Sequence, residues 1–362
     1  MTVPAIARRT RVIEGADART LPVAELIAEG RPTILRGLAR DVPLVAAARQ
    51  GPAAAVAWLK QFDGGQPVTA YIGDPAIGGR FGYNAACTAL NFARERGSLS
   101  AYLDQLLASV DDADAPSIYI GSTDIDQYLP GLRDEAVLPF GDPQLLAHPP
   151  LVSIWIGNRT IASAHHDMSN NIAVTLVGRR RFTLFPPDQV ANLYPGPLEP
   201  TPAGQVVSMV DFDAPDFVRH PGFADALDAA EVAEMEPGDA LIYPALWWHQ
   251  VEALDPFNAM INYWWNPTPR FMDTPQNTLL HALLSLRDRP DHEKRGWQAL
   301  FDYYVFGDSA RAGAHLPMDA RGALAQPFDQ RAGRGGQDSE SVWKDFGSRS
   351  CIRIVSITPS AA

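Results

Sequence analysis

From Leu151 to Trp265 the chain is a series of short runs rich in β-branched and aromatic residues, which glycine, proline or polar turn residues separate. These runs cover residues 151–156, 171–177, 181–185, 238–243, 247–254 and 258–265, and a further strand is expected at 117–120. Several short strands with turn residues between them predict a mainly β fold, either a sandwich or a barrel. The Pro-, Asp- and Ala-rich segment 195–236 is expected to be a long insertion between the two halves of that fold.

Helical or mixed segments are expected on both sides of the β region. Before it, the pattern predicts a strand at 32–37 and helices at 53–62 and 98–110. After Pro269, two amphipathic helices are expected, one beginning near Thr274 and one near Asp291. The expected parts are a mixed N-terminal flanking region (1–116), a β core (117–268), a helical region (269–325) and a polar, Gly-rich tail that is expected to be disordered (326–362).

Composition limits the classes of partner. The 362 residues carry a formal net charge of −12, so the chain has no bulk electrostatic reason to bind nucleic acid or an anionic membrane. Its two cysteines, Cys87 and Cys351, can form neither a disulfide framework nor a cysteine zinc site. We find no pattern typical of a signal peptide and no apolar run long enough to span a bilayer, and we therefore expect a soluble cytoplasmic protein.

Three side chains form a candidate metal site. In an extended strand, residues i and i+2 point to the same face, so His165 and Asp167 can reach one metal while His166 faces away. His249, at the start of a later strand, would supply the third ligand. Two imidazoles and a carboxylate with open positions opposite are typical of non-haem iron(II) oxygenases. On spacing alone, ordinary, partly buried histidines explain the same residues.

The open side of such a site suits a 2-oxo acid, which chelates the metal through its keto oxygen and adjacent carboxylate and leaves one place for O2. The far carboxylate then needs a cation and hydroxyl donors. Arg180 and Tyr119 are candidates, although a solvated charge and a packing residue are the simpler interpretations of each. Asn171 shares strand parity with the two ligands before it, and Asn262 is an amide among apolar neighbours that needs a partner, either structural or a bound carboxylate.

The stretch from about 151 to 267 also carries a family resemblance. The residues that carry it are His165-His166-Asp167 with Asn171, the run from Gly178 to Gln189, Leu193-Tyr194-Pro195, Val210-Asp211-Phe212, the run from Pro237 to Pro244, Trp247-Trp248-His249 and Asn262-Tyr263-Trp264. In this order they resemble the JmjC or cupin-like class of Fe(II)/2-oxoglutarate oxygenases. Within that class the chain is most similar to the asparaginyl hydroxylase that acts on hypoxia-inducible factor, and to its bacterial cupin-like relatives.

The resemblance implies a double-stranded β-helix, or jelly-roll, with flanking helices. It implies this ligand set: Fe(II) on His165, Asp167 and His249, the distal carboxylate of 2-oxoglutarate on Tyr119 and Arg180, and Asn171 and Asn262 near the chelating end. Two departures stand out. The family commonly has lysine where this chain has Arg180, and the family's threonine before the first ligand has no match, because Thr160 and Ser163 are both displaced.

We therefore expect an Fe(II)- and 2-oxoglutarate-dependent oxygenase that uses O2 to hydroxylate a C–H bond. By family analogy its substrate is a peptide or protein side chain, and Trp264 and the insertion near Asp211 are expected to line the substrate's path. The two C-terminal helices resemble the family's dimerising pair and predict a homodimer. Two alternatives remain open: a metal-binding cupin that acts as a sensor or scaffold without turnover, and a metal-dependent cupin enzyme that does not use 2-oxoglutarate.

Overall fold

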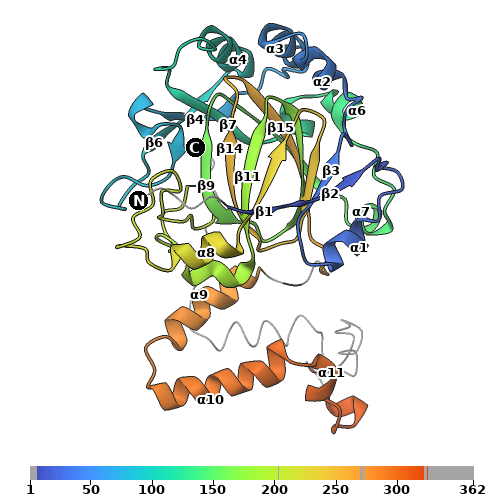
Figure 1. Cartoon of the computed structure of the whole chain (residues 1–362). Helices are drawn as coiled ribbons and strands as arrows, with labels where there is room; N and C mark the ends of the chain where they lie inside the picture. The colour runs from blue at the N-terminus through green and yellow to red at the C-terminus, as the bar shows by residue number, and fades with distance from the viewer. Residues whose placement is uncertain (1–5, 203, 270–271, 273, 322–323, 325–362) are drawn as a thin grey trace. The chain divides into compact units, whose positions relative to one another are not determined.

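The computed structural model describes residues 6–202, 204–269, 272, 274–321 and 324. The chain divides into two compact units, residues 1–267 and residues 268–362, and each is described by itself (Figure 1). The expected tail 326–362 lies outside the described residues. Among the helices that the structure describes, none combines the length and the apolar character that a membrane crossing requires.

Eight strands of the first unit form the β core. They are β8 (Leu151–Gly157), β9 (Ile161–His166), β10 (Asn170–Val177), β11 (Arg180–Phe185), β12 (Glu231–Met235), β13 (Ala240–Tyr243), β14 (Trp248–Ala253) and β15 (Asn258–Trp265). Four of them, in the order β13-β10-β15-β8, lie in one sheet, and the other four, in the order β12-β11-β14-β9, lie in a second sheet. Most successive strands change sheet, so the chain winds back and forth between two facing layers. The expected mainly β jelly-roll fold is confirmed.

Strands from the N-terminal segment lengthen both sheets (Figure 1). The larger sheet has nine strands and gains β2 (Arg11–Glu14), β3 (Thr33–Arg36), β4 (Val68–Gly73), β6 (Phe92–Gly97) and β7 (Ser117–Asp124). The smaller sheet has six strands and gains β1 (Arg8–Arg9) and β5 (Arg80–Phe81). Strands before residue 117 therefore extend the same two layers as the later strands.

Helices cover the outer face of the larger sheet. They include α2 (Pro43–Ala48), α3 (Pro52–Lys60) and α4 (Leu99–Ala108), whose apolar side chains share one core with Ile154 and Val174 of the sheet. The expected helices at 53–62 and 98–110 are confirmed as α3 and α4. Every residue of β10 is buried, because one face of that strand packs against this core and the other faces the second sheet. That double burial explains its nearly continuous apolar sequence.

The remaining helices of the first unit are short. They are α1 (Val23–Ala28), η1 (Pro75–Ile77), α5 (Ile125–Tyr128), α6 (Leu132–Ala136), α7 (Pro143–Ala147), η2 (Pro187–Ala191) and α8 (Phe223–Ala229). The segment 195–236 differs from the expected insertion, because its last residues form the core strand β12, which pairs with β11. Strand β12 has only five residues, in which the exposed Glu234 lies among buried apolar residues. So short a pattern of buried and exposed residues is hard to recognise within an acidic segment, which is why the sequence did not predict this strand.

The second unit is helical. It contains α9 (Pro275–Ser285), α10 (Asp291–Phe301), η3 (Asp302–Phe306), α11 (Ser309–Ala312) and η4 (Met318–Ala320). The two expected amphipathic helices are confirmed as α9 and α10. Neither helix has a fully buried residue, and large apolar side chains stay exposed on both.

Candidate metal centre

His165, Asp167 and His249 meet at one point between the two sheets. One ligand atom from each lies within 4.8 Å of the others. The imidazole rings of His165 and His249 are 4.4 Å apart between centroids, and His249 Nε2 lies 3.7 Å from Asp167 Oδ2. The two histidines are direct partners across the antiparallel pair of β9 and β14, so the ladder itself brings residues 84 positions apart onto one face.

A β-bulge in β9 orients the side chain of the first ligand, His165. Val251 of β14 pairs with Ala162 and His249 pairs with His165, so β9 has one more residue than β14 between these two pairs. The extra residue lets both Ala162 and His165 face the space between the sheets. His166 then faces the other way and packs on Trp248, with ring centroids 4.8 Å apart. The expectation that His166 turns away from the metal site agrees with this geometry.

Asp167 reaches the site by a different route from the one that strand parity suggested. Strand β9 ends at His166, and Asp167 lies in the turn where the chain crosses from the smaller sheet to the larger one. The backbone N–H of Leu246 donates to the carbonyl of Asp167 at 2.8 Å and fixes that turn. Leu246, two residues before the strand that carries His249, has φ +69°, a conformation that leucine rarely adopts.

Backbone carbonyls set the orientation of both imidazoles. His165 Nδ1 lies 2.9 Å from the carbonyl of Ser163, and His249 Nδ1 lies 3.0 Å from the carbonyl of Trp247. A carbonyl only accepts, so each Nδ1 carries a hydrogen, and Nε2 is the nitrogen that each ring offers to a metal. Burial lowers the pKa of His249 well below its ordinary value, and the neighbouring His165 lowers it further. Two imidazoles and a carboxylate suit a divalent transition metal such as Fe(II).

Two amides hold the carboxylate. Asn171 Nδ2 donates to Asp167 Oδ2 at 3.2 Å and to the hydroxyl of Tyr243 at 2.6 Å. Asn262 Nδ2 in turn donates to Asn171 Oδ1 at 2.7 Å. Asn171 and Asn262 come from neighbouring strands of the larger sheet and face the ligands on the smaller one. Tyr243 was not predicted as a site residue from the sequence; the pairing of β10 with β13 places it opposite Asn171.

Arg180 and Tyr119 lie deeper between the sheets. Arg180 is 1% exposed, and its Nε and one terminal nitrogen have no hydrogen-bond partner among the described residues. Burial lowers the pKa of this guanidinium, and the adjacent Tyr119 hydroxyl opposes the shift. Burial raises the pKa of Tyr119 to about 12, and Arg180 acts against that rise. In the part of the chain that the structure describes, Arg180 forms no ion pair, so its N–H groups fit a carboxylate that the protein does not supply.

The strand register shows how far Arg180 lies from the metal ligands along the sheet. In the pairing of β11 with β14, Leu184 lies opposite His249 and Arg180 lies opposite Ala253. Four residues of strand correspond to about 13 Å between the two levels, part of which the arginine side chain spans. The turn before Arg180 requires Gly178, which has φ +69° and on which a Cβ would lie 2.3 Å from the side chain of Asn258.

For the hydroxyl that the resemblance implies before the first ligand, Thr160 and Ser163 are the displaced candidates. Ser163 donates its hydroxyl to the carbonyl of Phe81 at 3.1 Å, outside the ligand cluster. Ser153, the register partner of Asn262, has a buried hydroxyl without a partner among the described residues. Ser153 therefore places a buried hydroxyl opposite Asn262 in the sheet.

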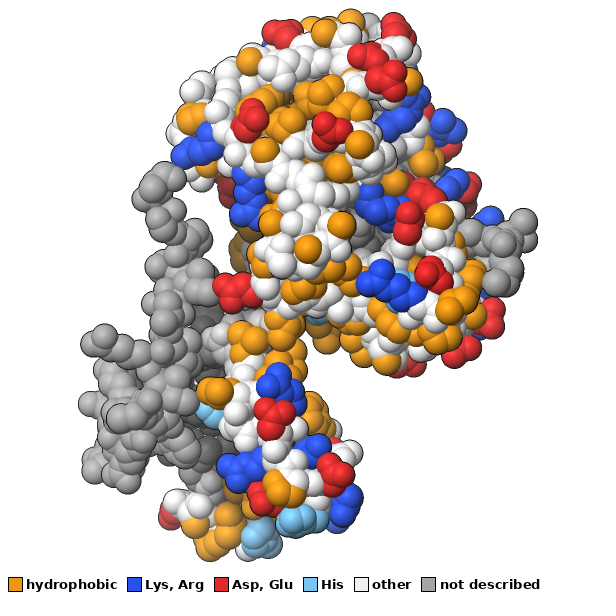
Figure 2. Space-filling view, turned by 90° about the vertical axis from the view of Figure 1, so that its left-hand side faces the viewer, with side chains coloured by type: hydrophobic (Ala, Val, Ile, Leu, Met, Phe, Trp, Pro, Cys, Tyr) orange, Lys and Arg blue, Asp and Glu red, His pale blue; other side chains and the backbone are white. Residues whose placement is uncertain are grey.

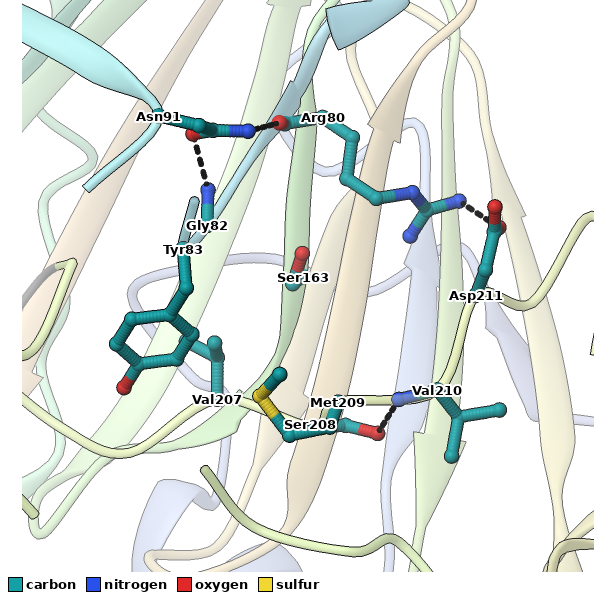
Figure 3. A pocket seen from close by; sticks show the side chains of 10 residues that line it. All are labelled: Arg80, Gly82, Tyr83, Asn91, Ser163, Val207, Ser208, Met209, Val210 and Asp211. Atoms are coloured by element: carbon teal, nitrogen blue, oxygen red, sulfur yellow. Dashed lines mark hydrogen bonds and ion pairs between the residues drawn. The ribbon is translucent and has the colours of Figure 1, made fainter. Parts of the chain in front are cut away.

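A small hollow lies beside β9 and is distinct from the ligand cluster (Figure 3). Its volume is about 130 Å³, and its lining includes Ser163, Tyr83, Met209 and Asp211. Arg80 crosses it and forms an ion pair with Asp211 at 2.8 Å. Several polar groups of the hollow are already paired: Asn91 with the backbone of Arg80 and Gly82, and Tyr83 with the carbonyl of Pro197.

Comparison with known proteins agrees with this geometry. A family model described as a cupin-like domain matches residues 18–271. The HSPB1-associated protein 1 homolog of Danio rerio is 33% identical over 114 residues, which are 31% of this chain and 25% of that protein. The lysine-specific demethylase JMJ31 of Arabidopsis thaliana is 26% identical over 129 residues, 34% of this chain and 23% of that protein. The tRNA wybutosine-synthesizing protein 5 of Danio rerio is 31% identical over 105 residues, 29% of each chain. The chain thus matches about a quarter of the length of these relatives.

Proposed function

The chain belongs to the cupin-like domain family, and we propose that it is an Fe(II)- and 2-oxoglutarate-dependent oxygenase that hydroxylates a C–H bond. The observation that carries this proposal is a two-part site. Two imidazoles and a carboxylate converge on one point, and a buried guanidinium without an ion-pair partner among the described residues lies deeper between the same sheets. One part fits the metal, and the other fits the far carboxylate of a dicarboxylic 2-oxo acid.

The iron(II) would supply the redox chemistry, in which O2 and 2-oxoglutarate yield succinate, CO2 and one oxygen atom for the substrate. The protein's own residues bind and orient the reactants. His165, Asp167 and His249 hold the metal, and Asn171 orients the carboxylate of Asp167. Arg180 and Tyr119 bind the far carboxylate in a place from which water is excluded.

Apolar side chains line the space between those two ends. Phe182, Val251 and Met260 belong to one buried cluster that includes residues of both sheets. Such a lining strengthens each hydrogen bond to a bound dicarboxylate, because water does not compete for it. The side chain of Asp167 is 23% exposed whereas that of His249 is 3% exposed, so solvent reaches the cluster from the Asp167 side.

We propose a peptide or protein side chain as the substrate. The net charge of −12 disfavours a polyanionic nucleic acid. One relative is named an HSPB1-associated protein and another a lysine-specific demethylase, whereas a third is named for tRNA wybutosine synthesis. Trp264 is half-buried and is the register partner of Asn171, which supports its place on the substrate path expected from the sequence. Asp211 lies at the separate hollow beside β9, where it pairs with Arg80.

The two alternatives make different demands on the site. A sensor or scaffold needs the metal ligands but has no use for a buried cation deeper in the fold. A cupin enzyme that does not use 2-oxoglutarate also leaves Arg180 without a ligand, and burying an unpaired guanidinium costs free energy. Arg180 therefore favours the oxygenase over both.

An anaerobic titration tests the proposal. Addition of 2-oxoglutarate to the Fe(II)-loaded protein should produce the visible metal-to-ligand charge-transfer band of a chelated 2-oxo acid, and admission of O2 should yield succinate. Both signals should vanish in His165→Ala and Asp167→Ala, and both should persist in His166→Ala, which changes the neighbour that faces away. A wild-type protein that binds Fe(II) but shows no band with 2-oxoglutarate would contradict the proposal.

A peptide-library screen identifies the substrate class. Peptides incubated with the protein, Fe(II), 2-oxoglutarate and O2 should include members that gain the mass of one oxygen atom, as mass spectrometry detects. The same library with Asp167→Ala should gain none. A library that stays unmodified while the protein oxidises small metabolites would redirect the substrate proposal.

We also propose that the C-terminal helices form a homodimer. Apolar side chains lie exposed on the surface of this unit (Figure 2). They include Leu279, Leu280, Leu284, Trp297, Leu300, Tyr304, Val305 and Phe306. A cluster of large apolar residues on a short helical segment is typical of an interaction surface. The resemblance to the family's dimerising helices supports a second copy as the partner.

A further inference from the structure

Tyr243 is a buried tyrosine beside the metal ligands, and it has no role in the function proposed above. It ends strand β13, is 2% exposed and belongs to the apolar cluster between the sheets. The centroid of its ring lies 5.0 Å from that of the His249 imidazole and 6.5 Å from that of Phe182. Its hydroxyl lies 2.6 Å from Asn171 Nδ2. The phenol is thus held at the ligand cluster from two sides.

The hydrogen bonds around Tyr243 have a fixed direction. An ionised carboxylate only accepts, so Asn171 must turn its NH2 group toward Asp167. The carbonyl oxygen of Asn171 then accepts from the NH2 group of Asn262. Because the same NH2 group of Asn171 also meets Tyr243, the phenolic oxygen is an acceptor in that contact. Asp167 thereby determines the orientation of both amides.

The hydroxyl hydrogen of Tyr243 consequently points elsewhere. Within the described residues, the only hydrogen bond found for this hydroxyl is the one that it accepts from Asn171. A buried O–H without an acceptor costs free energy. Asp167 Oδ2 already accepts from Asn171, and the three ligand atoms face a common point. A ligand bound at that point would bring oxygen acceptors next to the phenol.

We propose that Tyr243 is a further binding residue of the site, whose hydroxyl donates a hydrogen bond to the metal-chelating end of the 2-oxo acid. This inference rests on the proposed function. Arg180 and Tyr119 would bind the far carboxylate, and Tyr243 would bind the carboxylate or keto oxygen at the opposite end. The cosubstrate would thus be oriented by protein donors at both ends.

Tyr243→Phe isolates the hydroxyl. The phenylalanine ring keeps the packing on His249 and Phe182, and Asn171 keeps its bonds to Asp167 and Asn262. Tyr263→Phe is the matched control. Tyr263 is also a buried tyrosine, on strand β15 of the same sheet, but it lies on the opposite face, where its hydroxyl accepts from the backbone N–H of Leu138 at 2.8 Å.

The experiment follows the charge-transfer band anaerobically while 2-oxoglutarate is added to each Fe(II)-loaded protein. In Tyr243→Phe the Kd for 2-oxoglutarate should rise roughly ten- to hundredfold, because a hydrogen bond to a charged oxygen is lost. The band should also shift, whereas the affinity for Fe(II) alone should stay within about threefold of wild type, since no metal ligand changes. Tyr263→Phe should reproduce the wild-type Kd and band.

Two outcomes would overturn the inference while leaving the proposed function intact. One is a wild-type band and Kd in Tyr243→Phe. The other is a loss of Fe(II) affinity without 2-oxoglutarate, which would show that the hydroxyl acts through Asp167. If the wild-type protein itself develops no band, the proposed function fails first. A resonance Raman shift of the chelate modes between H2O and D2O in wild type tests the same hydrogen bond without a variant, and its absence would also count against the inference.

Discussion

Replacing Arg180 by methionine should change stability and cosubstrate binding in opposite directions. The guanidinium is 1% exposed and forms no ion pair among the described residues, so the apo protein bears most of its desolvation cost. Exchange of buried charged groups for an apolar side chain of similar volume stabilises proteins by about 1–4 kcal/mol. Loss of the contact with Tyr119 offsets about 1 kcal/mol of that gain. We expect apo Arg180→Met to be about as stable as wild type or up to about 3 kcal/mol more stable.

Binding of 2-oxoglutarate by Arg180→Met should weaken roughly a hundredfold or more, because a charge-assisted pair with the far carboxylate is lost in a dry pocket. Urea denaturation of the apo protein measures the first effect, and anaerobic titration of the Fe(II) form measures the second. Arg181→Met is the matched control: Arg181 is the next residue, its side chain is 42% exposed, and it pairs with Glu252. It should leave the Kd unchanged. Strong destabilisation of Arg180→Met with an unchanged Kd would refute the reasoning, since Arg180 would then be a structural cation.

Asp239→Ala should lower the free energy of unfolding by about 3–5 kcal/mol in urea denaturation. The reason is that the buried carboxylate pairs with Arg36 and thereby connects β3 to β13. A decrease of less than about 1 kcal/mol would contradict this. The guanidinium of Arg179 holds the pKa of Asp255 below its ordinary value of 3.8, so the stability that this pair contributes is present above that pH and is lost as the pH falls through the folded pKa. Asp255→Asn should therefore cost about 1 kcal/mol at pH 7, with a difference from wild type that narrows below pH 4, and a difference independent of pH would contradict the assignment. Leu284→Glu in α9 should convert a wild-type dimer into a monomer by light scattering, and an unchanged mass would exclude this face as the interface.

The strands were predictable where each carries its own pattern. Residues 258–265 and 171–177 are apolar runs closed by turn residues, and the structure places β15 and β10 there with nearly the same ends. Strand β12 was not predictable from local pattern, because five residues at the end of an acidic segment owe their conformation to pairing with β11. Pairing is a tertiary property, and no local preference encodes it.

The same distinction between local pattern and tertiary pairing applies to the candidate site. Strand parity placed His165 and Asp167 on one face, and the two do meet, but a bulge aims the histidine and a turn between sheets delivers the aspartate. Parity also suggested Asn171, although its strand belongs to the other sheet. Tyr243 was missed because its nearness to the ligands follows from the pairing of β13 with β10, about 70 residues apart in the chain.

A crystal structure of the protein grown anaerobically with Mn(II) and 2-oxoglutarate would show whether one site holds both the metal and the cosubstrate. We expect one anomalous peak bound by the Nε2 atoms of His165 and His249 and a carboxylate oxygen of Asp167. We also expect density for the five-carbon chain from that metal to the guanidinium of Arg180. A metal bound elsewhere, or density for the dicarboxylate that does not reach Arg180, would contradict the proposed site.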